Sequence, residues 1–211
     1  MLRWAIRAVA ASKYKNQAIR ESGQATRKAK DAMGKFRYAK NERDNTKKLD
    51  YVFLNAGMLG NIKKIDRVKY KEVEEILKVN VFANKEIIDF LIEKNIKTKL
   101  IVAISSGAAL APKLGWFLYC SSKAALKFLI ESYAIEHKKF KFISISPGLI
   151  KTKMQKQICK INEKKIKSVK KFKELNKKNM VPSPNEVADN LINSIKLLKK
   201  KSGDYIDIRK K

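Results

Sequence analysis

From residue 50 onward, short apolar runs alternate with longer stretches whose apolar side chains recur every three or four positions. Runs rich in β-branched residues at 50–55, 99–104 and 141–146 predict buried strands. The stretches 69–94 and 117–137 have the spacing of helices that bury one face. Strands that alternate with helices in this way are typical of βαβ units around a parallel sheet, so the pattern predicts an α/β fold.

The C-terminal part of the pattern predicts one more helix and one more strand. Ser183 has the features of a helix N-cap, because Pro184 occupies the first turn and Glu186 lies three residues after the cap. The buried face of this helix would consist of Val187, Leu191, Ile192, Ile195 and Leu198. A final short strand is predicted at Tyr205–Ile208.

Residues 1–49 differ from the rest of the chain in composition. They contain fourteen Lys or Arg and four Asp or Glu, and six of the eight arginines fall within residues 1–43. Two explanations are open for this segment: a basic amphipathic helix of the kind found in transit peptides and at membrane surfaces, or a rearranged N-terminus joined to a domain. We therefore divide the chain into an atypical basic segment, 1–49, expected to be helical or loosely ordered, and a second part, 50–211, with the α/β pattern.

The formal net charge of +29 raises the question of an anionic partner. The lysines are scattered over the whole chain without a zinc-finger, RRM or KH motif, so we expect no specific nucleic-acid partner. No apolar stretch reaches the length of a membrane span, which argues against an integral membrane protein. Cys120 and Cys159 form neither a disulfide framework nor a metal-ligand pattern, so we expect no metal site and a reducing, cytoplasmic location.

Four polar residues occupy positions where an α/β fold can use them for chemistry. Tyr119 and Lys123 are four residues apart and share a helix face, where an ammonium group can stabilise the phenolate of an acid/base tyrosine. Ser106 follows the strand 99–104, at the strand end where open parallel sheets bind ligands. Asn80 lies on the apolar side of its helix, where a buried amide needs partners. The alternatives are an exposed Tyr/Lys pair, an ordinary loop serine and a structural amide.

These residues together resemble the classical short-chain dehydrogenase/reductase family, over a match that runs from about Asp50 to the C-terminus. The order and spacing of that family's catalytic tetrad are found in Asn80, Ser106, Tyr119 and Lys123. Its cofactor motifs are similar to Asn55-Ala56-Gly57, Pro147-Gly148 and Thr152.

The resemblance implies a role for each matching residue. Tyr119 would donate a proton, and Lys123 would lower the pKa of Tyr119 and hold the nicotinamide ribose. Ser106 would orient the substrate carbonyl, and Asn80 would keep a proton-relay water in place. The other cofactor contacts implied are Asn55, Ala56, Gly57, Pro147, Gly148 and Thr152.

Finer details resemble the branch of the family that contains sepiapterin reductases and benzil reductases. They are Ser105-Ser106-Gly107-Ala108-Ala109, Gly115-Trp116, Tyr119-Cys120, Thr152-Lys153-Met154-Gln155, Ser183-Pro184 and Ser202-Gly203. The branch implies reduction of a carbonyl group in a ketone, a diketone or a pterin side chain, with NADP(H) favoured over NAD(H) as the cofactor. Lys151 and Lys153 stand where we expect the acid that anchors a pterin, so a ketone or diketone fits better.

The glycine-rich TGxxxGxG turn of this family, whose backbone amides bind the cofactor pyrophosphate, has no counterpart in the sequence. Gly23 and Gly34 are the only glycines before Gly57, and the 49 residues before Asp50 are too few for two βαβ units. We therefore expect a partial Rossmann-type, doubly wound parallel sheet that retains its second half. The strand 50–55 would then form an open apolar edge.

Besides a basic nucleic-acid binder, which only the net charge favours, two functions remain open on this basis. The first is an NAD(P)H-dependent oxidoreductase that reduces a small-molecule carbonyl, with a substrate loop around residues 149–180. The second is a catalytically inactive remnant of the family that acts at most as a binding or oligomerising module, because the glycine-rich cofactor loop is missing. The resemblance also implies a homodimer contact through the helices at 69–94 and 118–137.

Overall fold

Each apolar run that was predicted as a strand pairs with the next one along the chain. The structure, a computed structural model, describes residues 48–197 and 201–209. All strand pairs are parallel, with Tyr51 opposite Leu100, Ala103 opposite Ser144, and Ile145 opposite Ile206. The strands lie in the order β1 (Lys48–Leu54), β2 (Lys97–Ile104), β3 (Phe142–Ser146) and β4 (Tyr205–Asp207). The predicted α/β fold with a parallel sheet is confirmed.

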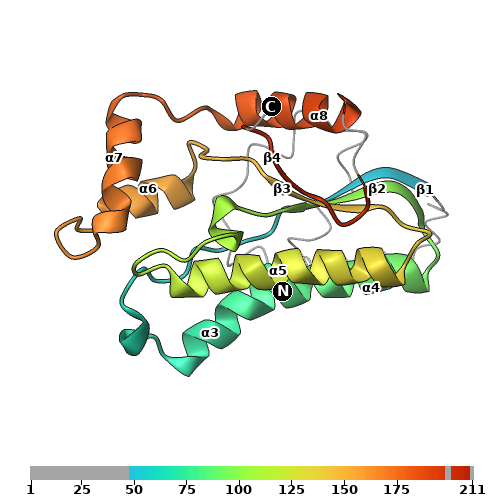
Figure 1. The fold of residues 1–211 in the computed structure, drawn as a ribbon, viewed down its shortest axis with the longest axis horizontal. Helices are drawn as coiled ribbons and strands as arrows, with labels where there is room; N and C mark the ends of the chain where they lie inside the picture. The colour runs from blue at the N-terminus through green and yellow to red at the C-terminus, as the bar shows by residue number, and fades with distance from the viewer. Residues whose placement is uncertain (1–47, 198–200, 210–211) are drawn as a thin grey trace, which may run out of the picture.

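Helices cover both faces of this sheet, as Figure 1 shows. One face is covered by α4 (Ala83–Glu93) and α5 (Phe117–Glu136), and the other by α8 (Pro184–Leu197). Alternate residues of each strand point to opposite faces. The α4/α5 side of the core contains Val52, Leu54, Ile101, Ala103 and Phe142. The α8 side contains Leu100, Val102, Ile143, Ile145 and Ile206.

The predicted helix at 69–94 forms, but with an irregular turn inside it. α3 (Tyr70–Leu77) continues through a π-helical turn, η3 (Lys78–Phe82), into α4. The helix at 117–137 is confirmed as α5. The predicted start of α8 is confirmed as well, since the Ser183 hydroxyl accepts from the Glu186 N–H at 3.3 Å and Glu186 accepts from the Ser183 N–H at 2.6 Å.

A small helical lobe follows β3 at the carboxyl end of the sheet (Figure 1). It consists of α6 (Lys153–Lys160), η5 (Lys167–Val169) and α7 (Lys170–Lys177). The lobe packs on the segment before α5, where the Trp116 and Phe172 rings stack with centroids 5.1 Å apart. Two further short turns are η2 (Ile65–Arg67) and η4 (Gly107–Ala109). None of the described helices is long and apolar enough to cross a membrane.

β1 is an edge strand of the sheet formed by residues 48–197 and 201–209, in which it pairs with β2 alone. Val52 and Leu54 are buried under α4 and α5, whereas Tyr51 and Phe53 on the other face are half-buried. The prediction of a helical or loosely ordered segment at 1–49 falls, apart from Lys48 and Leu49, outside the described residues.

Candidate active site

Asn80 lies at the centre of the π-helical turn η3 and is completely buried. Its side-chain oxygen accepts a hydrogen bond from the Met58 N–H at 2.7 Å. Its amide donates to the Met58 carbonyl at 2.9 Å and to the Ser122 hydroxyl at 2.8 Å. These three hydrogen bonds use both N–H donors and one of the two oxygen lone pairs of the buried amide. Asn80 therefore ties the loop after β1 to η3 and α5.

Asn84, one helical turn later, is a site residue that sequence reasoning missed. Its amide donates to the Asn80 backbone carbonyl at 2.8 Å, and its own side-chain oxygen is buried without a hydrogen-bond partner among the described residues. Two asparagines at i and i+4 on an otherwise apolar helix face were a signal for this pair.

Lys123 is buried beside Asn80, with 4% of its surface exposed. Its Nζ atom donates to the Ile104 carbonyl at 2.9 Å, and burial lowers the pKa of the Lys123 ammonium to about 8. Gly57 makes this close packing feasible, because a Cβ atom there would lie 3.3 Å from Lys123 Nζ and 3.6 Å from Asn80 Oδ1. The predicted residues Gly57, Asn80 and Lys123 thus come together at the end of β1.

Tyr119 lies one helical turn before Lys123, whose Nζ atom is 5.8 Å from the centre of the tyrosine ring. Burial raises the pKa of the Tyr119 phenol, and an interaction with the Ser106 side chain lowers it in part. The upward effect of burial is larger than the lowering by Ser106, so the net shift of the pKa is upward. The phenol therefore keeps its proton at neutral pH.

Ser106 forms the turn that follows β2. Its side chain caps η4 by accepting from the Ala108 N–H at 3.2 Å, and the same side chain interacts with Tyr119. The preceding residue, Ser105, is buried, and its hydroxyl has no partner among the described residues. The fold thus brings Ser106 and Tyr119 together, although thirteen residues separate them in the chain.

The other predicted cofactor residues lie at the ends of β1 and β3. Asn55 is exposed and Ala56 is buried directly after β1. Pro147 is buried after β3, Gly148 has φ +80°, and the Thr152 hydroxyl caps α6 by accepting from the Gln155 N–H at 3.4 Å. All of these residues follow carboxyl ends of parallel strands, the edge at which such sheets bind ligands.

Arg209, which follows β4, is a second residue that sequence reasoning missed. A Cβ atom at Gly148 would lie 2.6 Å from Arg209 Cδ, so the arginine side chain packs on the loop after β3. Its ion pair with Asp207 raises the pKa of Arg209. The Asp-x-Arg spacing at the end of a predicted strand is a weak signal, and it does not indicate which loop the arginine covers.

Tyr119 also belongs to an apolar cluster that joins α5 to the helical lobe. The cluster includes Trp116, Ile158 and Phe172, and the Trp116 ring meets Tyr119 edge-on with centroids 6.2 Å apart. Trp116 Nε1 donates to the Ser168 hydroxyl at 2.9 Å, and Ser168 donates to the Leu114 carbonyl at 2.9 Å. The lobe and Tyr119 therefore pack together in one apolar cluster.

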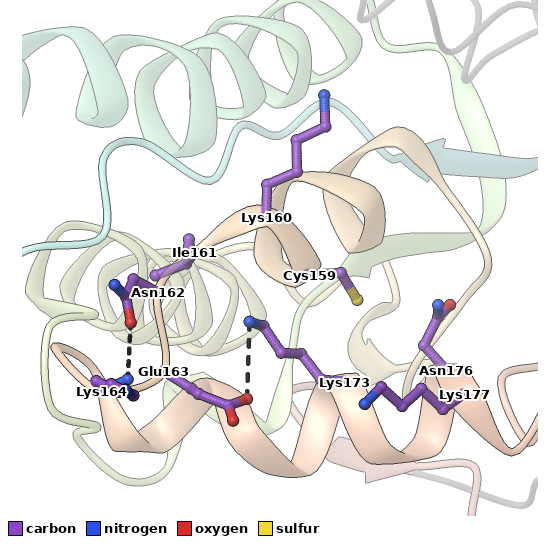
Figure 2. A pocket seen from close by; sticks show the side chains of 9 residues that line it. All are labelled: Cys159, Lys160, Ile161, Asn162, Glu163, Lys164, Lys173, Asn176 and Lys177. Carbon is purple, nitrogen blue, oxygen red and sulfur yellow. Dashed lines mark hydrogen bonds and ion pairs between the residues drawn. The ribbon is translucent and has the colours of Figure 1, made fainter.

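Two cavities open beside this cluster without containing the tetrad. One, of about 740 Å³, lies between the segment 108–115 and the first turns of α5. The other, of about 460 Å³, lies between α6 and α7 and is lined by four lysines together with Cys159 and Glu163 (Figure 2). Lys173 reaches across it to Glu163 at 3.6 Å. Among the described residues, no group of three or more His, Cys, Asp or Glu side chains could hold a metal ion.

Curated proteins similar to this chain are oxidoreductases. An uncharacterised oxidoreductase of Schizosaccharomyces pombe is 34% identical over 145 residues, which cover 67% of this chain and 59% of that protein. A benzil reductase of Bacillus subtilis that forms (S)-benzoin is 32% identical over 165 residues, covering 74% and 66%. A sepiapterin reductase of Xenopus laevis is 32% identical over 111 residues, covering 50% and 42%. The chain spans less than two thirds of the length of each of these relatives.

Solved structures show the same fold. The crystal structure of the KRED1-Pglu enzyme superposes with a TM-score of 0.72 at 24% identity, over 83% of this chain and 75% of that one. A short chain dehydrogenase from Escherichia coli CFT073, solved as a complex with NADPH, has a TM-score of 0.60 at 21% identity, over 84% and 68%.

The sequence model of one family, described as short chain dehydrogenase, matches residues 10–163. This range begins well before Asp50, so it includes most of the basic N-terminal segment as well as the part in which the motifs occur. With the fold and the relatives in agreement, the chain belongs to the short-chain dehydrogenase family and, within it, is similar to the benzil and sepiapterin reductases.

Proposed function

We propose that this chain reduces a ketone or a vicinal diketone to an alcohol with a nicotinamide cofactor, and that NADPH is preferred over NADH. The observation that carries the proposal is the position of Tyr119 beside Ser106 and Lys123 at the carboxyl end of the sheet, where burial raises the pKa of its phenol. A tyrosine that keeps its proton at neutral pH is in the state required to donate one. The names of the relatives support the same class of substrate.

The three side chains divide the work at the carbonyl oxygen. A reduced nicotinamide, held beside Lys123 and Gly148, would supply the hydride for the carbonyl carbon. Ser106 donates a hydrogen bond to the carbonyl oxygen, and Tyr119 transfers its phenolic proton to that oxygen as negative charge develops. Lys123, still cationic below its pKa of about 8, stabilises the phenolate that remains.

The residues around Lys123 fit the nicotinamide end of such a cofactor. An ammonium group has three N–H donors, and the described residues provide one acceptor for Lys123 Nζ, the Ile104 carbonyl. The remaining donors are available to the hydroxyls of a ribose. Asn55, Ala56 and Gly57 would line the same side of the site, and Pro147, Gly148 and Thr152 the nicotinamide side.

A non-catalytic role is the second candidate, because the sequence lacks the glycine-rich turn that binds the pyrophosphate. Titration of the protein with NADPH and NADH, followed by cofactor fluorescence, separates the two. Saturable binding supports the enzyme, whereas no binding at millimolar cofactor supports a binding module.

We further propose that the chain forms a homodimer through the outer faces of α4 and α5. These helices lie side by side on one face of the sheet (Figure 1). Large apolar side chains are exposed on them and on the adjoining π-turn, namely Phe82, Phe128 and Ile135. Burial of such a group against a second copy removes apolar surface from water.

The proton-donor role is tested with Tyr119→Phe. Because only the phenolic oxygen is removed, NADPH oxidation with a diketone should slow by about 10²- to 10⁴-fold while the melting temperature changes little. Tyr70→Phe is the matched control, since Tyr70 is 83% exposed, and it should retain the full rate. A Tyr119→Phe protein with an unchanged rate would show that the proton comes from elsewhere.

A further inference from the structure

The Arg209 side chain is held in a fixed position by hydrogen bonds to Asp207, two residues earlier in the chain. Asp207 Oδ1 accepts from Arg209 Nε at 2.8 Å and from the Arg209 backbone N–H at 3.1 Å, and Asp207 Oδ2 accepts from Arg209 Nη2. The Asp207 side chain is 9% exposed, whereas the Arg209 side chain is 57% exposed. A bidentate pair of this kind fixes both the place and the plane of the guanidinium group.

The guanidinium group lies over the carboxyl ends of two neighbouring strands. Gly148 follows β3 and leaves room for Arg209 Cδ, which a Cβ atom there would approach to 2.6 Å. Gly107 follows Ser106 in the loop after β2, and a Cβ atom there would lie 3.7 Å from Arg209 Nη2. Arg209 Nη2 therefore lies close to Gly107, the residue that follows the serine proposed to hold the reacting carbonyl.

The bonds to Asp207 leave part of the guanidinium free to bind a ligand. Arg209 has five side-chain N–H groups, of which Nε and Nη2 each use one on Asp207. The Nη1 donors point to no acceptor among the described residues that would compete with a ligand. The Asp207 carboxylate beside the guanidinium would repel a second carboxylate, whereas it would not repel a neutral oxygen acceptor.

We propose that Arg209 is a specificity-determining residue that donates a hydrogen bond to the second oxygen of a vicinal diketone. This proposal rests on the proposed function, in which Ser106 and Tyr119 hold the oxygen of the first carbonyl. The adjacent carbonyl group then extends past Ser106 toward Gly107, where Arg209 Nη2 lies. A simple ketone has no oxygen at that position and gains nothing from the arginine.

The test compares a matched pair of substrates, 1-phenylpropane-1,2-dione and 1-phenylpropan-1-one, which differ by one carbonyl oxygen. In Arg209→Gln, kcat/KM for the diketone should fall about 10- to 100-fold, as expected for loss of a hydrogen bond from a charged donor. The value for the monoketone and the Kd for NADPH should change by less than about threefold. Arg209→Lys, which keeps the charge but loses the planar fork, should fall between wild type and Arg209→Gln.

Lys99→Gln is the control for loss of one positive charge. Lys99 is 63% exposed and pairs with Asp50 near the start of β2, at the opposite end of the strand from the site. The ratio of kcat/KM for diketone to kcat/KM for monoketone should therefore equal that of wild type in this variant. Melting temperatures of all variants show whether the fold is kept.

Three results would overturn the proposal. An equal fall in kcat/KM for diketone and monoketone in Arg209→Gln would mean that Arg209 supports the fold. Weaker NADPH binding, with an unchanged ratio of kcat/KM for the two substrates, would mean that Arg209 serves the cofactor. A preference for phenylglyoxylate that disappears in Arg209→Gln would mean that the residue binds a carboxylate.

Ligand-observed NMR separates failure of this proposal from failure of the proposed function. It measures the affinities of wild type and Arg209→Gln for the same two ketones without turnover. If wild type reduces no carbonyl compound, the proposed function fails. A diketone preference that is present in wild type and absent in Arg209→Gln still supports the role of Arg209, and equal preferences in the two proteins reject it.

Discussion

Burial acts on Lys123 and Tyr119 in opposite directions on the pKa scale, and in both cases it favours the neutral form. It lowers the pKa of the lysine to about 8 and raises that of the tyrosine. At neutral pH the lysine is still charged and the tyrosine still protonated. In the function proposed above, this protonation state suits proton donation to a carbonyl.

The buried ammonium makes the stability of the protein depend on pH. In the unfolded chain, Lys123 has the ordinary lysine pKa of 10.5, so between about pH 8 and 10.5 the unfolded state binds a proton that the folded state has lost. Stability relative to a Lys123→Met variant should therefore be lowest below pH 8. It should rise through this window by up to about 1.4 kcal/mol per pH unit.

Urea unfolding of wild type and Lys123→Met at pH 7, 8, 9 and 10 measures this difference directly. Other lysines and tyrosines titrate in the same range, but they contribute equally to both proteins and cancel in the comparison. If the stability of wild type relative to Lys123→Met stayed constant or fell above pH 8, the lowered pKa of Lys123 would be contradicted.

Single residues were predictable from the sequence where their partners are local. Tyr119 and Lys123 lie within one helix, so their spacing alone placed them on a shared face. The partners of Asn80 are 22 and 42 residues away along the chain, so no local pattern identifies Met58 and Ser122. Arg209 reaches Gly148 by packing between loops, which only the assembled sheet determines.

At the scale of elements, the sequence predicted a helix at 69–94, which forms at 70–93, but it did not predict the π-turn within it. The apolar residues have the same helical spacing on both sides of η3. One wide turn changes the position of the following residues around the helix axis too little to be recognised in the sequence. The turn places Asn80 and Val81 in the buried layer and leaves Phe82 half exposed. Wide turns of this kind are frequent at functional sites, and this one contains a residue of the predicted tetrad.

The helical lobe depends on a short chain of hydrogen bonds from Trp116 through Ser168 to Leu114. Ser168→Ala removes the acceptor of a buried indole N–H, which should weaken the attachment of the lobe by about 1–3 kcal/mol. Amide hydrogen exchange across residues 153–177 should therefore become faster, while exchange in β1–β3 stays slow.

Ser132→Ala is the matched control for this prediction. The Ser132 hydroxyl donates to the Phe128 carbonyl within its own helix, at 3.0 Å, and touches no part of the lobe. Exchange at residues 153–177 should remain at the wild-type rate in this variant. If Ser168→Ala left the lobe equally protected, stacking of Trp116 on Phe172 alone would be sufficient to hold it.

At the scale of the whole molecule, the exposed apolar face of α5 makes assembly testable. Phe128→Glu places a charge at the centre of the proposed homodimer contact, where Phe128 is 72% exposed in the single chain. Sedimentation equilibrium should show a shift from dimer to monomer, because burying an unpaired carboxylate is costly. Met180→Glu, at a residue 64% exposed in the loop before α8, should leave the dimer intact. A wild-type protein that sediments as a monomer would reject the contact.

The order of the strands in space is the same as their order along the chain, from β1 to β4. During synthesis at about 5–20 residues per second, β2, β3 and β4 each meet a described partner strand that has already been made. Among the described strands, each new one is added next to the strand made just before it. Arg209 and Asp207 come with the last of the described strands, so the edge where ligands bind is completed only at the end of this sequence of events.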